Sequence, residues 1–584
     1  MGTAQGQVDR ADGSATRRSA GSPAAAGYVS GRKLARLRWG TWLLAALIAV
    51  VFLLHLQAWR FLCDDAFISF RYARNLGEHG ALVYNLAPLE RVEGYTNFLW
   101  VLTLAAGVVV GLAPEQLAPV LTAGAGLASL WLIASIVAAL RRDGHGPTAA
   151  LHPLDMLAPG LLVLVPEFVV WGSSGLETGV ALALGLGAIR AWLGKRLELA
   201  ALLAGLAGLT RPDALLWIAA FGLGWLAVTA IARRSEKKPL TAGLPWKRVA
   251  IALVIFVALV GGQLIFRKVY YGQWLPNTWA VKQHGALLRD SWGLPYLEFW
   301  SARLGLIALA PLVLLLRPRH LSLVAPILAV LVYAWSVGGD FMAYGRFLLP
   351  ATALLAALVA LLLADLSALL RPRVSNNTPI IIGALASALL IPCAWRVPQR
   401  IAEDRQHAHL HLDYDADNKA IPGTPGFEGV QAMDRFAAVR LRAGAVLADA
   451  VPADTWISVG AAGALPYASR LPAYDAYGLV DPGVLEAAEP SGDASARPGH
   501  QLHAPLPYMR SRDPDLMCHI GWEAAVAPTR RDARRRAGAG WGWACVQTGP
   551  IPDRREASGH LPGRFYCCLR PLDRLAALDP EGPR

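Results

Sequence analysis

The sequence predicts an α-helical polytopic membrane domain of about 11 transmembrane helices, followed by an extracytoplasmic α/β domain. Three observations lead to this fold class. The 584 residues are 55% hydrophobic and only 17% charged, with a mean hydropathy of +0.39. Apolar runs long enough to cross a bilayer recur between Trp42 and Ala394. The residues after Trp395 are more polar, with short apolar runs and many Pro and Gly, which is typical of a mixed α/β domain.

The chain divides into three parts on this basis. Residues 1–38 are rich in Ala, Gly, Ser and Arg without an apolar period, and we expect a disordered, basic cytoplasmic tail. Residues 39–395 form the predicted transmembrane domain, and residues 396–584 form the C-terminal domain. The first apolar run has no small-residue cleavage site after it, so we expect an anchor helix and not a cleaved signal peptide.

Basic residues near the ends of spans indicate the topology, because they favour the cytoplasmic side. The basic tail places the N-terminus in the cytoplasm. If the short apolar stretch 98–112 is interfacial or re-entrant, all five later basic clusters between helices also lie inside; if it spans, all five lie outside. We therefore predict spans at 42–59, 118–140, 154–170, 178–192, 197–210, 214–232, 249–266, 303–316, 321–337, 347–370 and 379–394.

This topology places five polar loops on the extracytoplasmic face, together with the C-terminal domain. The loops are 63–97, 171–177, 210–213, 267–300 and 338–346. Non-helical backbone at membrane depth is stable only where protein buries it or where it lines a wet cavity, so we expect the loops to converge on such a cavity. The net charge of +13 comes largely from basic clusters between apolar runs, which suit anionic lipid headgroups and not nucleic acid. We expect a multi-pass protein of the cell (plasma) membrane.

The strongest candidate for chemistry is the sequence CDDAFISFRYARN at residues 63–75. Asp64 and Asp65 follow the first apolar helix within about one turn, and adjacent side chains point about 100° apart on a helix. The two carboxylates therefore suit different tasks, one as a general base on an acceptor hydroxyl and the other orienting a cation or a basic side chain. Which of them is the base stays open, with Asp65 favoured. The alternative is that both cap the following helix, which explains one aspartate better than two.

Two further extracytoplasmic loops carry acids and hydroxyl-binding groups. Glu93, Tyr95 and Asn97 lie on one short loop, and this set suits a sugar site because rings stack on sugars and polar groups bind hydroxyls. An interfacial aromatic belt is the alternative for that loop. Glu177 opens an apolar helix. We expect Glu177 to be catalytic because ionisable groups at this depth are functional by default, with helix capping as the alternative.

Cationic residues on the same face suit a lipid phosphate, since Arg binds phosphate oxygens through a two-pronged fork. Arg211 and Arg346 break the positive-inside pattern, and an anionic ligand is one reason for that. Lys282 follows a turn that contains Gly and Pro. We expect these three residues to bind the phosphate. The alternative is structural pairing, of Arg211 with Asp213 or of Arg346 with Asp340.

The C-terminal domain contains four cysteines and an alternating run of histidines. The cysteines permit one or two disulfides in an oxidising compartment, and because two are neighbours in sequence we expect one bridge and not two. A metal site on the histidines is a minor alternative to a solvated face, since no Cys or acid lies at ligand spacing. These residues are Cys518, Cys545, Cys567 and Cys568, and His407, His409 and His411.

Taken in order, several short motifs resemble the GT-C superfamily of membrane glycosyltransferases, and more closely the terminal arabinofuranosyltransferases of cell-wall arabinan assembly. Each motif is short, but their order is specific and covers most of the chain. The small departure is Ala343-Tyr344 after the GGDFM motif. The matching stretches are DDAFI at 64–68, RNL at 74–76, ERVEGYTN at 90–97, SGLET at 174–178, LPNT at 275–278, GGDFM at 338–342, DAYGLVDP at 475–482, GH at 499–500, PLPYM at 505–509 and RDPD at 512–515.

The resemblance implies a GT-C-like fold, a polyprenyl-phosphate sugar donor and inversion at the anomeric carbon. It also implies an extracytoplasmic site with its essential aspartate in the first loop. On the matching motifs, Asn277 and Asp340 join Glu93, Tyr95 and Asn97 as expected sugar- or acceptor-binding residues. It does not name the sugar, and relatives of similar appearance use mannose, other hexoses or pentoses.

Residues and resemblance together predict an inverting glycosyltransferase that moves a sugar, with arabinofuranose among the candidates, from a polyprenyl-phosphate donor to an envelope glycan or another extracytoplasmic acceptor. Because the leaving group is already a phosphate, catalysis needs mainly a base for the acceptor and fixed cations for the developing charge. No cofactor is certain, and a divalent ion between Asp64 or Asp65 and the phosphate stays open. The alternatives are a transporter or flippase of lipid-linked intermediates and a non-catalytic scaffold. A transporter places ionisable groups near the midplane and shows repeat halves, whereas here the candidates lie at one face.

Overall fold

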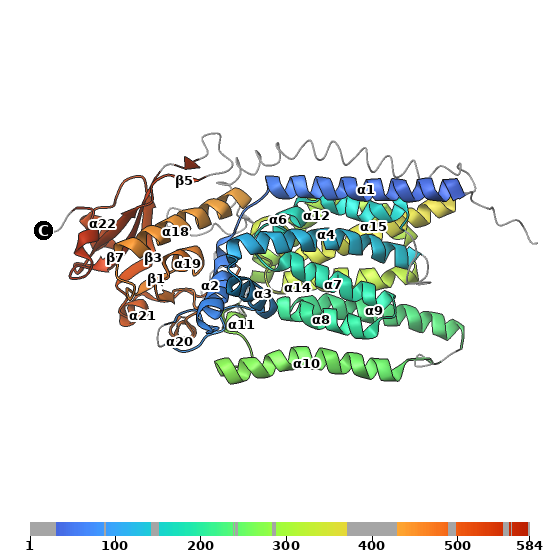
Figure 1. Cartoon of the computed structure of the whole chain (residues 1–584), viewed down its shortest axis with the longest axis horizontal. Helices are drawn as coiled ribbons and strands as arrows, with labels where there is room; N and C mark the ends of the chain where they lie inside the picture. Colours follow the sequence, from blue (N-terminus) through green and yellow to red (C-terminus); the bar gives the residue numbers. More distant parts are fainter. Residues whose placement is uncertain are drawn as a thin grey trace, which may run out of the picture.

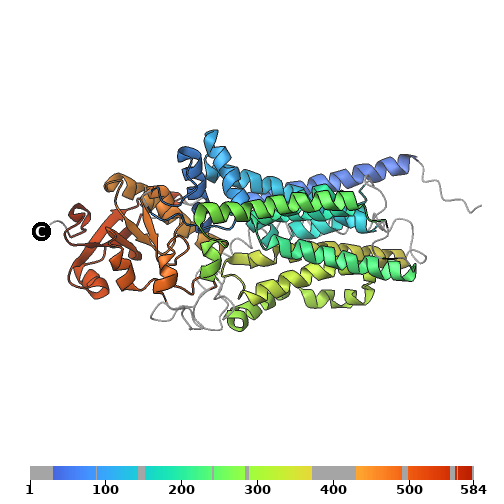
Figure 2. The same cartoon turned by 90° about the horizontal axis from the view of Figure 1, so that it is seen from below.

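The computed structural model describes residues 31–581, apart from 87–88, 142–150, 238, 240–242, 283–287, 371–428, 489–497, 553–559 and 562. Two parts lie end to end along the longest axis of the molecule (Figures 1 and 2). The helical unit, residues 31–370, is a bundle of helices, and the C-terminal unit, residues 429–581, is a mixed sheet with helices around it. The predicted boundary at 395–396 lies outside the described residues and stays a prediction, as does the tail before residue 31.

In the described part of the chain, six helices are long and apolar enough to cross a membrane. Other apolar helices are shorter, among them α3 (Phe98–Val109), α7 (Thr178–Leu193) and α8 (Leu197–Thr210). The predicted number of about eleven spans is therefore not confirmed, while the helical class is. The six candidate spans are Trp39–Ala58 in α1 (Gly31–Ala58), α4 (Pro114–Arg141), α9 (Ala214–Ser235), α10 (Trp246–Tyr271), Pro318–Ser336 with α14 (Leu321–Ser336), and Ala343–Leu369 with α15 (Leu349–Leu370).

Two of the predicted spans differ from the structure for reasons visible in the sequence. The stretch 154–170 is divided between η1 (Pro153–Met156), α5 (Leu157–Val163) and α6 (Pro166–Trp171), because Pro166 cannot continue a helix and begins a new one. The stretch 303–316 is divided because Gly305, with a φ of 61°, ends α12 (Leu294–Leu304). It continues as α13 (Leu306–Leu309) and the 3₁₀ turn η4 (Ala310–Leu315). The predicted span 379–394 lies outside the described residues.

Helices α2 (Asp64–His79) and α3 pack against each other at the end of the bundle that faces the C-terminal unit (Figure 1). Helix α3 has 12 residues, which at 1.5 Å per residue gives about 18 Å, less than the roughly 30 Å of a bilayer core. Helix α3 is thus not among the six candidate spans, and the interfacial or re-entrant position of the stretch 98–112 stays a prediction.

The C-terminal unit is built on a five-stranded sheet in the order β2-β1-β3-β7-β4. Strand β1 is parallel to both of its neighbours, and β7 is antiparallel to β3 and β4. The predicted α/β class is therefore seen; that the unit is soluble and extracytoplasmic stays a prediction. The strands are β1 (Ile457–Val459), β2 (Ala473–Asp475), β3 (Leu516–Ala524), β4 (Trp541–Gln547) and β7 (Phe565–Pro571), and β5 (Ile551–Pro552) pairs with β6 (His560–Leu561) separately.

Both possible disulfides form, which corrects the expectation of a single bridge. Cys518 is bonded to Cys568, and Cys545 to Cys567. The neighbouring cysteines lie on β7, where successive side chains point to opposite faces of the sheet. The two side chains therefore do not compete for one partner: Cys568 is bonded to Cys518 of β3 and Cys567 to Cys545 of β4. The predicted histidine run at 407–411 lies outside the described residues.

The remaining elements are the 21-residue helix α18 and a set of short helices and turns. They are α11 (Asn277–Lys282), η3 (Arg289–Gly293), η5 (Pro318–His320) and η6 (Ala343–Leu348) in the helical unit, and α18 (Val430–Ala450), α19 (Ala464–Ser469), α20 (Gly483–Ala487), α21 (Leu506–Ser511), α22 (Arg530–Ala537) and η8 (Ala576–Leu578) in the C-terminal unit.

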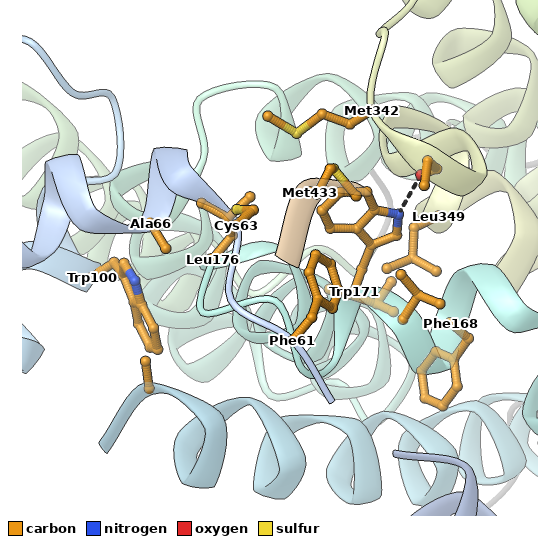
Figure 3. Packing of buried hydrophobic residues seen from close by; sticks show 14 of the residues in the cluster. Phe61, Cys63, Ala66, Trp100, Phe168, Trp171, Leu176, Met342, Leu349 and Met433 are labelled. Carbon is orange, nitrogen blue, oxygen red and sulfur yellow. Dashed lines mark hydrogen bonds between the residues drawn. The ribbon is translucent and has the colours of Figure 1, made fainter. Parts of the chain in front are cut away.

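One large buried apolar cluster runs from the helical unit into the C-terminal unit. Met433 of α18 belongs to the same cluster as Trp171, Cys63 and Met342, whose loops carry the predicted site residues (Figure 3). The Trp171 indole also donates a hydrogen bond of 3.1 Å to the carbonyl oxygen of Ala343. The loops at the junction are therefore packed from both sides.

Candidate active site

The predicted site residues lie at the ends of helices, where several extracytoplasmic loops were expected to converge. Asp64 and Asp65 open α2, while Asn97 and Glu177 directly precede α3 and α7. Three cations come from other elements: Arg211 between α8 and α9, Lys282 at the end of α11, and Arg346 in η6. The charges of Lys282, Arg346, Asp340 and Glu177 all act on the pKa of Asp65, so the chain folds these loops into one electrostatic site.

Asp65 is a half-buried carboxylate without a hydrogen-bond or ion-pair partner among the described residues. Burial raises the pKa of Asp65 above its usual value, while the positive charges of Lys282 and Arg346 act in the opposite direction. A carboxylate with free lone pairs and a raised pKa is suited to accept a proton.

Lys282 is the cation with the greatest effect on Asp65. Its side chain is open to solvent, yet desolvation lowers the pKa of the ammonium group, and the charge of Asp65 opposes that shift. Together these properties describe a group that water reaches but that protein surrounds on most sides. None of the described residues forms an ion pair or hydrogen bond with its ammonium, which leaves its three N–H donors available.

Arg346 is held by the GGDFM loop. Its Nε donates a 2.8 Å hydrogen bond to Asp340 Oδ2, and its guanidinium lies over the Trp171 ring at 5.4 Å. The loop requires glycine at Gly339, where φ is 74° and a Cβ atom would meet the Tyr296 ring at 2.7 Å. The predicted alternative of an Arg346–Asp340 pair is thus present, but it uses one of the five guanidinium donors.

Glu177 connects two other predicted residues. Its Oε1 accepts a 3.0 Å hydrogen bond from Arg211 Nη1, and its Oε2 accepts one of 2.7 Å from Asn97 Nδ2. Asn97 also donates to Ser69 Oγ at 2.9 Å, and Arg211 forms a two-pronged pair with Asp213 at 3.0 Å. Since both carboxylate oxygens of Glu177 are occupied and the residue is 5% exposed, this arrangement suits a positioning role better than the catalytic role predicted for it.

A small pocket lies between α7, α9 and the segment 346–350. The charged residues that line it are Arg211, Asp213 and Arg346, and Leu182, Trp217 and other apolar residues line most of the rest. Thr178 lines it as well; its hydroxyl is buried and has no hydrogen-bond partner among the described residues. An unsatisfied buried hydroxyl is unfavourable, so the pocket has polar capacity for an anionic group and an apolar wall beside it.

Asp64, the other carboxylate of the doublet, is bound to the C-terminal unit. Its Oδ2 accepts the N–H of Gly463 at 3.1 Å, and its Oδ1 accepts the N–H of Ala464 at 2.9 Å. Burial raises its pKa to about 6, against the effect of these hydrogen bonds and of Arg440. The two aspartates therefore differ in their contacts, but Asp64 accepts backbone N–H groups and not the cation or basic side chain expected for one of the pair; the division of tasks stays a prediction.

Three of the predicted sugar- or acceptor-binding residues are committed to other partners. Glu93 forms a buried ion pair with Arg267, and Tyr95 contacts the Tyr271 hydroxyl at 3.2 Å. The Asn277 amide donates to the carbonyl oxygens of Gly478 at 2.6 Å and Leu479 at 3.0 Å in the C-terminal unit. These contacts favour structural roles, since buried groups with satisfied partners have little left for a ligand.

Three residues that make notable contacts were not identified from the sequence. Thr178, which lines the pocket, appears in the sequence analysis only within the SGLET motif. Arg71 and Arg74 lie seven and ten positions after Asp64, so helical spacing places Asp64 and Arg71 on nearly the same side of α2, and that spacing was the available signal. No group of three or more His, Cys, Asp or Glu side chains able to hold a metal occurs in the residues that the structure describes. We therefore derive no step through a divalent ion.

Comparison with solved structures identifies proteins that share the overall fold of this chain. ArnT from Cupriavidus metallidurans bound to undecaprenyl phosphate matches with a TM-score of 0.51 and 15% identity, over 90% of this chain and 97% of that one. The apo state of the same protein matches with a TM-score of 0.51 and 13% identity, over 91% and 98%. The helical unit and the ArnT-like fold together define a multi-pass membrane protein of the GT-C fold class.

Sequence comparison gives a more specific likeness. The chain is 30% identical over 321 residues to a terminal beta-(1->2)-arabinofuranosyltransferase of Mycobacterium tuberculosis. The aligned region covers 50% of this chain and 47% of that protein. It thus spans about half the length of the curated relative. A family described as "Domain of unknown function (DUF8728)" matches residues 431–549. The resemblance to GT-C enzymes and to terminal arabinofuranosyltransferases, predicted from the motifs, is confirmed.

Proposed function

We propose that this chain is an inverting glycosyltransferase that moves a sugar from a polyprenyl-phosphate donor to a hydroxyl group of an extracytoplasmic glycan. The observation that carries the proposal is the unpartnered Asp65 carboxylate within electrostatic reach of Lys282 and Arg346. A general base needs a free lone pair for the proton it accepts, and a phosphate leaving group needs fixed cations. The similarity to a terminal arabinofuranosyltransferase and the fold shared with a protein solved with undecaprenyl phosphate support the same class.

The reaction is one displacement at the anomeric carbon. The acceptor oxygen bonds to that carbon while its proton passes to Asp65, and the bond from the carbon to the phosphate oxygen breaks with its electron pair staying on the phosphate. Attack from the face opposite the leaving group inverts the configuration. Lys282 and Arg346 stabilise the charge on the departing polyprenyl phosphate.

We assign the donor phosphate to the pocket between Arg211 and Arg346. Arg211 uses three N–H groups on Glu177 and Asp213, and Arg346 uses one on Asp340, so each guanidinium retains donors for phosphate oxygens. The unpaired Thr178 hydroxyl adds a further donor. The apolar wall of the pocket suits the first units of a prenyl chain, which cannot leave an apolar environment without cost.

Arabinofuranose is the sugar that we propose, and an envelope glycan is the acceptor. The support is the similarity to the mycobacterial protein, together with the motif order of the sequence. The proposed orientation places the site and the C-terminal unit outside the cell membrane, where nucleotide sugars are absent and a lipid carrier supplies the donor.

The test is sugar transfer by the purified full-length protein in liposomes. A panel of polyprenyl-phosphate sugars, including the arabinofuranose donor, is offered with an arabinan oligosaccharide acceptor, and wild type is compared with Asp65→Asn. The matched control is Asp290→Asn, which changes an exposed acid of η3. We expect transfer from one donor, a loss of at least about a thousandfold in Asp65→Asn, and wild-type transfer in the control.

Two outcomes would contradict the proposal. Folded wild-type protein that transfers no sugar from any donor, but moves the lipid-linked sugar between leaflets, would indicate a flippase. Full transfer by Asp65→Asn would remove Asp65 from the mechanism and leave the base unassigned.

A further inference from the structure

We propose that the C-terminal unit is a positioning element of the reaction centre, and that Asp64 is the positioning residue through which it acts. This inference rests on the proposed function of Asp65 as the base. It gives a role to the matched region 431–549, whose family description states no function. The role is to bind the first turn of α2 and thereby fix the direction of the Asp65 carboxylate.

The amino end of α2 is fastened by the Asp64 carboxylate. Its two oxygens accept the N–H groups of Gly463 and Ala464 at 3.1 and 2.9 Å. Because adjacent side chains on a helix are about 100° apart, anchoring Asp64 fixes the rotation of the turn that carries Asp65. Hydrogen bonds to an ionised carboxylate are stronger than neutral ones, so this contact is suited to hold the first turn of α2 in place when substrate binds.

The contact is also sterically specific. A Cβ atom at Gly463 would lie 2.0 Å from the backbone oxygen of Asp64 and 2.4 Å from its Oδ2. Both distances are far below van der Waals contact, and the first involves backbone, so any side chain at position 463 displaces the start of α2. Only glycine lets the two backbones approach this closely.

Two arginines further along α2, Arg71 and Arg74, bind the same segment of the C-terminal unit through their positive charges. Arg71 donates to the carbonyl oxygens of Pro466 at 2.5 Å and Leu471 at 2.8 Å, and Arg74 donates to that of Tyr467 at 2.8 Å. The carboxylate of α2 thus meets N–H groups at the beginning of α19, and its guanidinium groups meet carbonyl groups at the end. The negative carboxylate therefore faces the positive end of the α19 peptide dipoles, and the positive guanidinium groups face the negative end.

These arginines make the two units difficult to separate. Arg71 is 3% exposed and forms no salt bridge among the described residues, so backbone carbonyls and the Asn85 amide solvate its charge. Burial lowers its pKa to about 10. A buried cation that loses its acceptors is strongly destabilised. The attachment of α2 to the C-terminal unit is therefore a fixed part of the fold.

The test compares Gly463→Ala with Gly460→Ala in the full-length protein. The second change is the matched control, because a Cβ atom at Gly460 would meet its nearest atom, Tyr477 Cε2, at 3.4 Å. A displacement near 1 Å at a reacting group reduces rate by about a hundredfold, so Gly463→Ala is expected to lower kcat by about that factor with the donor KM within about threefold. Gly460→Ala is expected to keep wild-type kcat and KM. Rates are normalised to the protein fraction that binds undecaprenyl phosphate, which removes misfolded molecules from the comparison.

A second measurement does not depend on activity. In Asp64→Asn one of the two carboxylate oxygens becomes an amide nitrogen, which cannot accept an N–H, so hydrogen–deuterium exchange of at least one of the amides of Gly463 and Ala464 is expected to accelerate at least about tenfold. Wild-type exchange rates in Asp64→Asn, or wild-type kcat in a folded Gly463→Ala, would overturn the inference. Absence of transfer by the wild-type protein would instead refute the proposed function, and the exchange measurement would still decide whether Asp64 anchors the C-terminal unit.

Discussion

Replacing Glu177 by Gln distinguishes a positioning carboxylate from a catalytic one. The change keeps the shape of the side chain, but the new amide can accept at only one of the two contacts that Glu177 now makes, 3.0 Å to Arg211 and 2.7 Å to Asn97. Asn97 can reverse its amide to pair with the amide nitrogen of Gln, so Arg211 keeps a neutral acceptor and the main loss is the negative charge in the hydrogen bond to Arg211. Such a bond contributes about 1.5–3 kcal/mol, which corresponds to roughly ten- to a hundredfold in rate or affinity.

The expected result is therefore a decrease of roughly ten- to a hundredfold in kcat/KM, carried largely by the donor KM because Arg211 lines the proposed phosphate pocket. Initial rates of transfer at varied donor concentration separate the two parameters. Asp65→Asn is measured in the same assay and gives the decrease in rate expected when the proposed base is lost. If Glu177→Gln loses kcat as completely as Asp65→Asn while the donor KM is unchanged, the positioning role is wrong and Glu177 takes part in the proton transfer.

Three further results are expected. Lys282→Met removes a positive charge that lowers the pKa of Asp65; since the base must be ionised, activity is lost as pH falls through its pKa, and the acid limb of the kcat/KM profile should move to higher pH by on the order of one unit. An unchanged limb would mean that another group titrates. Arg346→Lys replaces a planar fork by a point charge, and the Kd for undecaprenyl phosphate, measured by calorimetry, should rise about tenfold with the fold intact; an unchanged Kd would remove this residue from the phosphate site. Removing the Cys545–Cys567 bridge, which spans 22 residues, should destabilise the C-terminal unit by about 3 kcal/mol in denaturant-dependent pulse proteolysis, and a change below 1 kcal/mol would mean that the bridge constrains little.

Hydropathy and charge were sufficient to predict that several of the polar loops come together. The end of the first apolar run places Asp64 and Asp65 at a helix end, and the basic clusters assign the polar loops to one face. The structure brings Glu177, Arg211 and Asn97 from three such loops into direct contact. These predictions depended on patterns that extend over whole segments, such as apolar runs and basic clusters, and such patterns can be recognised in a single sequence.

The partners of individual charges could not be predicted in the same way. Glu93 is paired with Arg267, 174 residues away, and Asp64 with Gly463, 399 residues away. Such contacts depend on how helices and sheet approach in space, and no local pattern encodes them. The disulfides are a milder case: the rule that successive side chains on a strand point to opposite faces is simple, but applying it required knowing that Cys567 and Cys568 lie on a central strand between two partners.

The charges of the site suggest how donor binding prepares the base. The positive groups are Lys282, Arg211 and Arg346, and the negative groups are Asp65, Glu177, Asp213 and Asp340, so the fully ionised set carries a net charge of −1. Asp340 already pairs with Arg346, and Lys282 shares its charge with no fixed partner among the described residues. A donor phosphate that draws on Lys282 and Arg346 weakens the attraction of both for Asp65, which raises the pKa of Asp65 further. In the proposed mechanism, the carboxylate thus becomes a stronger base once the donor is bound, when an acceptor hydroxyl has a sugar to attack.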